Sequence, residues 1–210
     1  AAQAAIVCSP FGMTLGRRPM AGKATGKARR VALFLFDGVD LLCTSGPACL
    51  LVYAARHLAR LGKPGYEIGY FSATGGALVT KQGLVVAARP LAEVRAAELD
   101  TIILPGGDSE EWRDPVIVSW LASQGPDVRR FAGISCGAFY LAYAGLLDGR
   151  SATTHWSECD LLEASFPQVN VVRDSIYVRD GGVWTSAGAA AGLGCPGRSS
   201  FEARCARTSG

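Results

Sequence analysis

The sequence predicts an α/β fold in which a mostly parallel sheet lies between layers of helices. From residue 30 onward, apolar stretches with the length of buried strands alternate with stretches of helical periodicity. Hydrophobic residues make up 49% of the chain and charged residues 19%, which supports a large core and excludes wholesale disorder. The 26 glycines follow no three-residue repeat, so we expect them in tight turns rather than in a fibre.

The chain is expected to hold one domain with two extensions. Its 210 residues are enough for a domain that buries a full core. Residues 1–29 are rich in Lys and Arg, lack periodicity and have the reverse order of a secretory signal, so a disordered basic leader is expected. Residues 30–192 carry the α/β pattern. Residues 193–210 have no apolar face and are expected to form an irregular tail.

The first half of the domain is predicted to alternate strands and helices. Residues 31–36 form a continuous apolar run, which is typical of a strand buried on both faces. A helix is expected from Ser45 to residue 61, with Pro47 in its first turn and Gly62 at its end. The following elements are expected in chain order: a strand at 66–72, a hairpin of 77–80 with 84–87, a short helix at 90–97 and a buried strand at 101–104.

The second half continues this alternation. A helix is predicted at residues 116–123 and a buried strand at residues 131–134. Residues 137–147 are apolar on almost every side, which indicates a deeply buried helix. Further short strands are expected at residues 151–154, 169–172, 175–178 and 183–186.

Charge and cysteine usage exclude several classes of function. Six of the 21 basic residues and none of the 18 acidic ones lie in residues 1–30, so the remainder has a net charge of −3 and no nucleic-acid footprint. No apolar run approaches the roughly 18 residues of a membrane span. The seven cysteines form no Cys-x-x-Cys pair and only two histidines are present, so no metal site is expected. Their odd number and irregular spacing favour a reducing, cytoplasmic compartment.

Three segments follow the carboxyl ends of predicted strands, where ligands bind in open α/β sheets. They are residues 37–44, 105–108 and 135–137. In the second segment, Gly106 and Gly107 are candidates to offer backbone N–H groups to an oxyanion. An ordinary turn after a strand is the alternative interpretation.

The third segment has the form of a nucleophile elbow. Gly133-Ile134-Ser135-Cys136-Gly137 runs from a buried strand directly into a helix, where small glycines relieve backbone crowding. The start of that helix favours a developing anion. Either Ser135 or Cys136 is therefore a candidate nucleophile. The alternative is that the glycines only allow the helix to pack against the sheet.

His155 ends the next predicted strand, within reach of this turn. It is a candidate general base or orienting donor for the nucleophile, and a purely structural histidine is the alternative. No Walker loop and no G-x-G-x-x-G after a strand occur in the sequence, so no cofactor is expected.

A series of short motifs resembles the ThiJ/PfpI superfamily. In chain order they are Phe36-Asp37-Gly38-Val39, Ser45-Gly46-Pro47, Leu104-Pro105-Gly106-Gly107, Gly137-Ala138-Phe139, Ala152-Thr153-Thr154-His155-Trp156 and Val183-Trp184-Thr185-Ser186. Within the superfamily they are most similar to the amidotransferase-like sensor domain of GlxA-type, AraC-family transcriptional regulators, and isonitrile hydratase is a near relative. The resemblance covers residues 30 to about 192. It implies a flavodoxin-like three-layer sandwich, a homodimer and a ligand pocket.

The chain departs from the family pattern at two positions of this pocket. The family's elbow usually has cysteine two places before Gly137, where this chain has Ser135, with Cys136 one place later. Serine needs a base more than cysteine does, because its hydroxyl is hardly ionised at neutral pH. Hydratase-like members carry an aspartate where this chain has Cys43, and Asp40 lies nearby in a different register. A mechanism that requires that carboxylate is therefore in doubt.

The preferred hypothesis is a small-molecule-sensing domain separated from its DNA-binding half. Residues 193–210 do not resemble the helix-turn-helix module of the regulators, so no direct nucleic-acid binding by this chain is expected. The second hypothesis is a hydrolase or hydratase of a small substrate. There Ser135 or Cys136 attacks, His155 carries the proton, and the N–H groups of Gly107 and Cys136 hold the oxyanion. The third is an inactive, truncated remnant.

Overall fold

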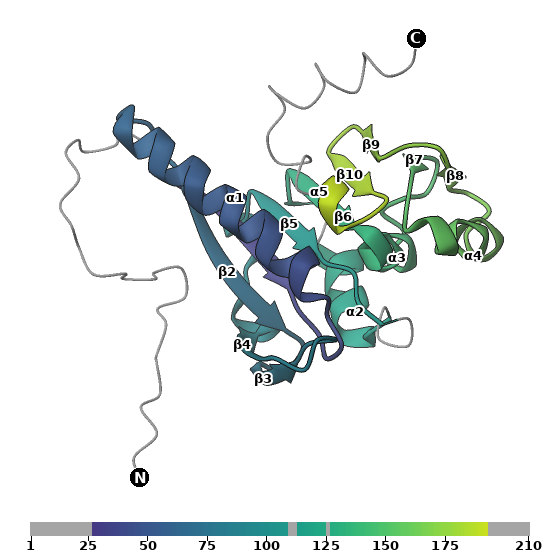
Figure 1. The fold of residues 1–210 in the computed structure, drawn as a ribbon, viewed down its shortest axis with the longest axis horizontal. Coiled ribbons are helices and arrows are strands. Elements are labelled where there is room, and N and C mark those ends of the chain that lie inside the picture. The colour runs from purple at the N-terminus through teal and green to yellow at the C-terminus, as the bar shows by residue number, and fades with distance from the viewer. Residues whose placement is uncertain (1–26, 109–112, 125–126, 193–210) are drawn as a thin grey trace.

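The chain folds around one eight-stranded sheet. In a computed structural model, residues 27–108, 113–124 and 127–192 are described (Figure 1). The strand order is β3-β4-β2-β1-β5-β6-β10-β9. The strands are β1 (Arg29–Phe34), β2 (Tyr66–Ser72), β3 (Gly76–Val79), β4 (Val85–Pro90), β5 (Thr101–Leu104), β6 (Arg130–Ile134), β9 (Tyr177–Asp180) and β10 (Val183–Ser186). Only the edge strands β3 and β9 of this described sheet pair antiparallel, which confirms the predicted mostly parallel sheet.

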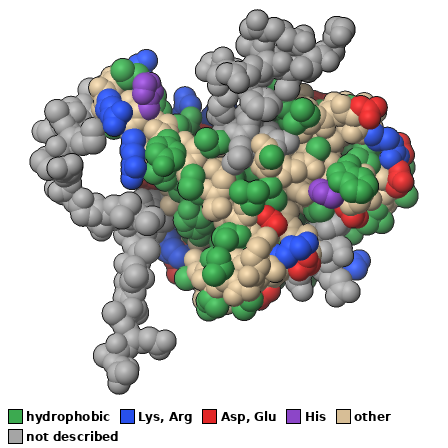
Figure 2. Space-filling view, viewed as in Figure 1, with side chains coloured by type: hydrophobic (Ala, Val, Ile, Leu, Met, Phe, Trp, Pro, Cys, Tyr) green, Lys and Arg blue, Asp and Glu red, His purple; other side chains and the backbone are tan. Residues whose placement is uncertain are grey.

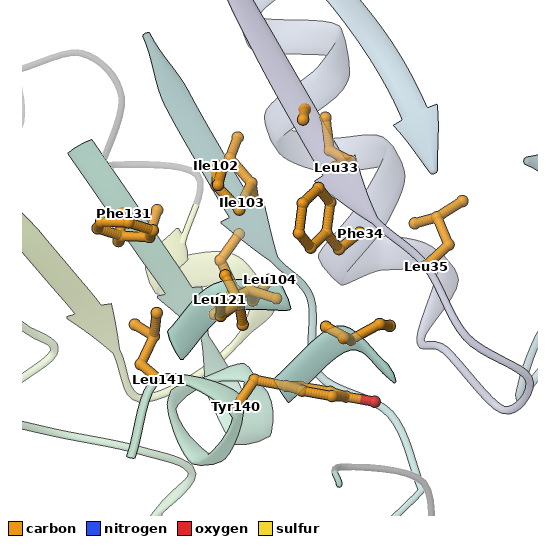
Figure 3. Packing of buried hydrophobic residues seen from close by; sticks show 14 of the residues in the cluster. Leu33, Phe34, Leu35, Ile102, Ile103, Leu104, Leu121, Phe131, Tyr140 and Leu141 are labelled. Atoms are coloured by element: carbon orange, nitrogen blue, oxygen red, sulfur yellow. The ribbon is translucent and has the colours of Figure 1, made fainter. Parts of the chain in front are cut away.

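Helices cover both faces of this sheet. They are α1 (Leu41–Arg60), α2 (Pro115–Gln124), α3 (Ala138–Tyr143), α4 (Cys159–Ser165) and α5 (Ala189–Gly192). Helix α1 lies beside α5, and α2 lies beside α3 on the opposite face (Figures 1 and 3). The strands β7 (Ser151–Ala152) and β8 (Asn170–Val171) form a separate two-stranded sheet near α4. This arrangement is the predicted flavodoxin-like three-layer sandwich.

The core lies on both faces of the central strands. In β1, Val31, Ala32, Leu33 and Phe34 are all buried, as expected for a continuous apolar run. The Phe34 ring meets Trp120 of α2 edge to face, with ring centroids 5.2 Å apart. Figure 3 shows Phe34 near Leu121 and Tyr140, so β1, α2 and α3 share one core.

Helix α1 begins four residues earlier than the prediction of Ser45. The Asp40 side chain accepts a hydrogen bond from the Cys43 N–H at 2.9 Å and caps the helix there. Pro47 consequently lies inside the helix, not in its first turn. The predicted end is confirmed, because Gly62 has φ +67° and the Lys63 N–H bonds the Leu58 carbonyl at 2.9 Å.

The predicted helix at 137–147 is shorter, because α3 ends at Tyr143. Gly145 has φ +72°, its N–H bonds the Ala142 carbonyl at 2.9 Å, and the Leu146 N–H bonds the Leu141 carbonyl at 2.9 Å. This Schellman motif ends the helix although apolar residues continue.

Other predictions also need correction. The strands expected at 151–154 and 169–172 are only two residues long, as β7 and β8. The expected helix at 90–97 is a pair of 3₁₀ turns, η1 (Leu91–Glu93) and η2 (Ala96–Glu98), because Val94 between them is extended. The strand expected at 175–178 is β9, which begins at Tyr177 and follows its partner β10 to Asp180. Helix α4 has no counterpart among the predictions.

The predicted leader and tail lie almost entirely outside the described residues. The leader was expected at residues 1–29, of which residues 1–26 are not described, and the tail at residues 193–210 is not described either. The last residue of the expected leader, Arg29, belongs to β1. No helix in the described part of the chain is long and apolar enough to cross a membrane.

Candidate functional site

A pocket of about 970 Å³ opens at the carboxyl edge of the sheet. All residues that the sequence singled out line it: Asp40, Cys43, Gly106, Gly107, Ser135, Cys136 and His155. They come from four separate places, namely the start of α1, the loop after β5, the turn after β6 and the loop after β7. The fold therefore brings together residues that are more than a hundred positions apart in the sequence.

Ser135 occupies the apex of the turn after β6. Its φ is +55°, and it is the one non-glycine residue of the described chain with positive φ. This left-handed conformation costs a non-glycine residue about 1–2 kcal/mol. The backbone conformation of Ser135 therefore differs from that of Cys136, and a residue at such a sharp strand-to-helix turn is held at the edge of the sheet.

A buried hydrogen bond joins the turn at Ser135 to the loop after β7. Thr154, which is fully buried, donates from Oγ1 to the Ser135 carbonyl oxygen at 3.1 Å. Because Thr154 precedes His155, this bond also ties the loop after β7 to the elbow.

Glycine is required where the loop after β5 meets the elbow. A Cβ atom on Gly137 would lie 1.9 Å from the Leu104 carbonyl oxygen. A Cβ atom on Gly106 would lie 2.9 Å from Cβ of Ser135. The backbone of the two segments is thus in direct contact, which brings Gly106 and Ser135 to the same pocket wall.

The two thiols of the pocket are protonated at neutral pH. Burial raises the pKa of Cys136 to about 12, although the Ser135 hydroxyl and Lys81 act in the opposite direction. Burial likewise raises the pKa of Cys43 to about 12, against a hydrogen bond from the Gly106 N–H. Since the thiolate is the reactive form of cysteine, neither thiol is activated in this state.

His155 makes its hydrogen bonds away from the elbow. Its Nδ1 atom lies 2.8 Å from Oγ of Ser157, and that hydroxyl donates to Oε1 of Glu158 at 2.8 Å. Among the described residues, no hydrogen bond joins His155 to Ser135 or Cys136. The predicted base is therefore in the pocket but is not engaged with either candidate nucleophile.

Asp40 has a structural partner for each carboxylate oxygen. Oδ1 accepts from the Cys43 N–H at 2.9 Å and Oδ2 accepts from Nε2 of Gln82 at 2.8 Å. Burial raises its pKa, but the hydrogen bonds from Cys43 and Gln82 outweigh this and hold the pKa below its ordinary value. Asp40 thus joins α1 to the β3–β4 hairpin beneath the pocket.

Replacing Asp40 by Ala is expected to lower the free energy of unfolding by about 0.5–2 kcal/mol, as for other lost N-caps. Because the folded pKa lies below the unfolded one, the charge-dependent part of this stability is present above the unfolded pKa of about 3.8 and disappears as pH falls through the folded pKa. Urea unfolding of D40A and wild type at neutral and acidic pH measures both effects. D40N, which keeps a capping oxygen but does not titrate, is the control. A D40A deficit that stays constant down to pH values below both pKa values would contradict the argument.

Part of the pocket wall was not predicted from the sequence. Lys81 and Gln82 line the pocket from the turn between β3 and β4. Nζ of Lys81 forms an ion pair with Oδ1 of Asp108, another lining residue, at 2.9 Å. Trp156 ends the motif that contains His155, and it lines the pocket with 76% of its surface exposed instead of packing in the core, which its sequence position had favoured. Glu158 also lines the pocket but lies two positions beyond that motif. The hairpin residues carried no such signal, because only the folding back of β3 on β4 brings them to the pocket.

The described residues contain no cluster of three or more His, Cys, Asp or Glu side chains that could hold a metal ion. The residues that line the pocket supply hydroxyl, thiol, imidazole, carboxylate, ammonium, amide and backbone N–H groups.

Comparison with known proteins finds a match to one protein family over most of the chain. Residues 29–194 match the DJ-1/PfpI family. An uncharacterized protein in the cpoL 5′ region of Streptomyces lividans is 35% identical over 145 residues, which are 68% of this chain and 99% of that protein. The HTH-type transcriptional regulator GlxA of Rhizobium meliloti is 35% identical over 144 residues, which are 67% of this chain and 43% of the regulator.

Isonitrile hydratase of Pseudomonas putida is 36% identical over 99 residues, which are 45% of this chain and 41% of the enzyme. The chain thus spans less than half the length of the regulator and of the hydratase.

Among solved structures, a THiJ/PfpI family protein from Pseudomonas syringae has a TM-score of 0.69 at 24% identity, and the match covers 88% of this chain and 72% of that protein. An AraC family transcriptional regulator from Pseudomonas putida has a TM-score of 0.65 at 20% identity. That match covers 79% of this chain and 86% of the regulator structure. These two likenesses concern the fold.

Proposed function

The chain belongs to the DJ-1/PfpI family and is related to the GlxA-type regulators, and on this premise we propose that its pocket binds a small molecule as a sensing domain. The observation that carries the proposal is the contrast between a formed pocket and unactivated nucleophiles. The pocket of about 970 Å³ is of the size that takes small organic ligands. Its two thiols are protonated, and its histidine is bonded to Ser157 instead of to the elbow.

We expect a ligand of this pocket to raise the melting temperature, because it binds the folded chain only. A ligand at about 100 times its Kd adds about 2.7 kcal/mol, which for a domain of this size is roughly 5–10 °C. The measurement is a thermal-shift screen of amino acids, amines, polyols and short carboxylic acids, each followed by mass spectrometry for chemical change. Binding without turnover supports a sensor, and turnover of the bound compound would overturn it.

A pocket-filling variant makes this screen specific. Gly188 lines the pocket, and no described residue has an atom within 4 Å of a Cβ atom built on it. G188F should therefore keep the fold and lose the ligand-dependent shift. H57F, at the exposed far end of α1, is the matched control and should keep the shift. Equal shifts in wild type and G188F would place binding outside this pocket.

A homodimer in the cytoplasm is part of the proposal. Leu50 and Tyr53, three positions apart on one face of α1, are exposed, and Figure 2 shows hydrophobic side chains along this helix. Burial of such a face between two chains would remove apolar surface from water. A single-chain mass in light scattering at micromolar concentration would contradict it.

A serine hydrolase is the second candidate, and the strained elbow at Ser135 favours it. If Ser135 is a nucleophile, a fluorophosphonate probe should label the protein, and S135A should abolish labelling. C136A is the control and should retain it. Absence of labelling in the wild type would count against catalysis by Ser135 and leave the sensing proposal in place.

A further inference from the structure

We infer that Ser157 and Glu158 are positioning residues that set the protonation of the His155 ring and leave its Nε2 atom as a hydrogen-bond acceptor for the pocket. This inference rests on the proposed function in one respect, namely that the pocket lined by His155 is where a ligand binds. It adds the chemical requirement that such a ligand should present an N–H or O–H donor to His155.

The first step is the direction of the hydrogen bonds. An ionised Glu158 can only accept, so the single hydroxyl proton of Ser157 is donated to its Oε1 atom, 2.8 Å away. The Ser157 Oγ atom also lies 2.8 Å from Nδ1 of His155. With its proton directed to Glu158, Oγ can only accept at this contact, so Nδ1 must carry the proton.

The opposite assignment is less favourable. If Ser157 donated to Nδ1, an oxygen lone pair would face the Glu158 carboxylate at 2.8 Å without a proton between them. One contact does favour an unprotonated Nδ1, because the Ser157 backbone N–H points to it at 3.4 Å. That contact is longer and weaker than the two at 2.8 Å, so the side-chain relay outweighs it.

The second step concerns the other ring nitrogen. A neutral imidazole has one N–H, and a proton on Nδ1 leaves a lone pair on Nε2. No hydrogen bond within the described chain reaches Nε2. A histidine side chain free in water prefers its proton on Nε2, so the relay imposes the less common tautomer.

The relay is held by local structure that exists without a ligand. His155 precedes the 3₁₀ turn η6 (Trp156–Glu158), which places Ser157 and Glu158 in one turn beside the ring. The Glu158 N–H bonds the His155 carbonyl at 2.9 Å and closes that turn. On the other side, the bond from Thr154 to Ser135 fixes the chain just before His155.

Long-range ¹H–¹⁵N NMR of the histidine rings tests the inference directly. The chain has two histidines, so H57Q assigns the signals of His155. In the unliganded protein at neutral pH, we expect His155 mainly as the Nδ1–H tautomer. Both S157A and E158A should shift it to the Nε2–H tautomer, and S157T, which restores a hydroxyl, should restore Nδ1–H. D160A, which removes the ion pair between Asp160 of α4 and Arg173 of the loop after β8, is the control and should change nothing.

An Nε2–H tautomer in the wild type, or an unchanged tautomer in S157A, would overturn the inference. The readout needs no ligand, so a metabolite screen without hits would count against the sensing proposal and not against the relay. If a hit is found, a methylated analogue without the donor group should lose its thermal shift in the wild type. Retention of that shift would overturn the donor requirement.

Discussion

Replacement of Gly137 by Ala is expected to lower the free energy of unfolding by about 3 kcal/mol or more, or to prevent folding. The added Cβ atom would lie 1.9 Å from the Leu104 carbonyl oxygen and 2.9 Å from the Pro105 carbonyl oxygen. Both neighbours are backbone atoms, so no side-chain rotation relieves the overlap. Either β5 or the elbow must move, and both belong to the buried centre of the sheet.

Urea unfolding followed by circular dichroism measures this change, with G188A as the matched control. In the part of the chain that the structure describes, nothing lies within 4 Å of a Cβ atom on Gly188, and its φ is not in the left-handed region. G188A should therefore match the wild type or gain a few tenths of a kcal/mol, because alanine restricts the unfolded chain. Unfolding free energies of G137A and G188A within about 1 kcal/mol of each other would refute the packing argument.

Replacement of Thr154 by Val is expected to cost about 0.5–1.5 kcal/mol, because it removes one of the two hydrogen bonds to the Ser135 carbonyl, which keeps the bond from the Ala138 N–H. The adjacent Thr153 provides an unusually close control. Both threonines are fully buried, but Oγ1 of Thr153 has no hydrogen-bond partner among the described residues. T153V should therefore be neutral or stabilising, since it removes a buried polar atom that is not satisfied.

The same urea experiment on T153V and T154V separates the two roles. The expected result is a clear loss for T154V and none for T153V. Equal effects would mean that the hydrogen bond to Ser135 contributes nothing, and that only the shape of the side chains matters. T154S, which keeps the hydroxyl, should recover most of the loss.

Much of the fold could be predicted because its signals are local. The strand at 66–72 and the strand at 101–104 were predicted with the bounds observed for β2 and β5. β5 is buried along its whole length, whereas β2 is less apolar and ends shortly before the turn glycines Gly75 and Gly76. Gly62 was recognised as the end of α1 because a glycine that adopts positive φ is a local signal for the end of a helix. The errors lie where one local signal outweighs another. Asp40 rather than Pro47 set the start of α1, and the Schellman motif at Gly145 ended α3 inside an apolar stretch.

The candidate site could be predicted as a set of residues but not as a chemical state. The motifs around Ser135 and His155 identified residues that the fold brings to one pocket. They could not predict the positive φ of Ser135, which lies against Gly106 and accepts a hydrogen bond from Thr154, both of them distant in the sequence. They also could not identify Lys81, because a hairpin must fold back before that residue lies near Asp108.

The order of residues along the chain is enough to specify the alternation of strands and helices, and with it the sheet edge at which a pocket forms. Periodicity, capping residues and turn glycines act over a few positions, so they can be read without knowing the neighbours in space. The state of the groups in the pocket depends on distant neighbours. Burial from several elements raises the pKa values of Cys43 and Cys136, and the bond from Thr154 supports the strained Ser135. Desolvation and packing are long-range properties, so these features arise only when the three layers assemble.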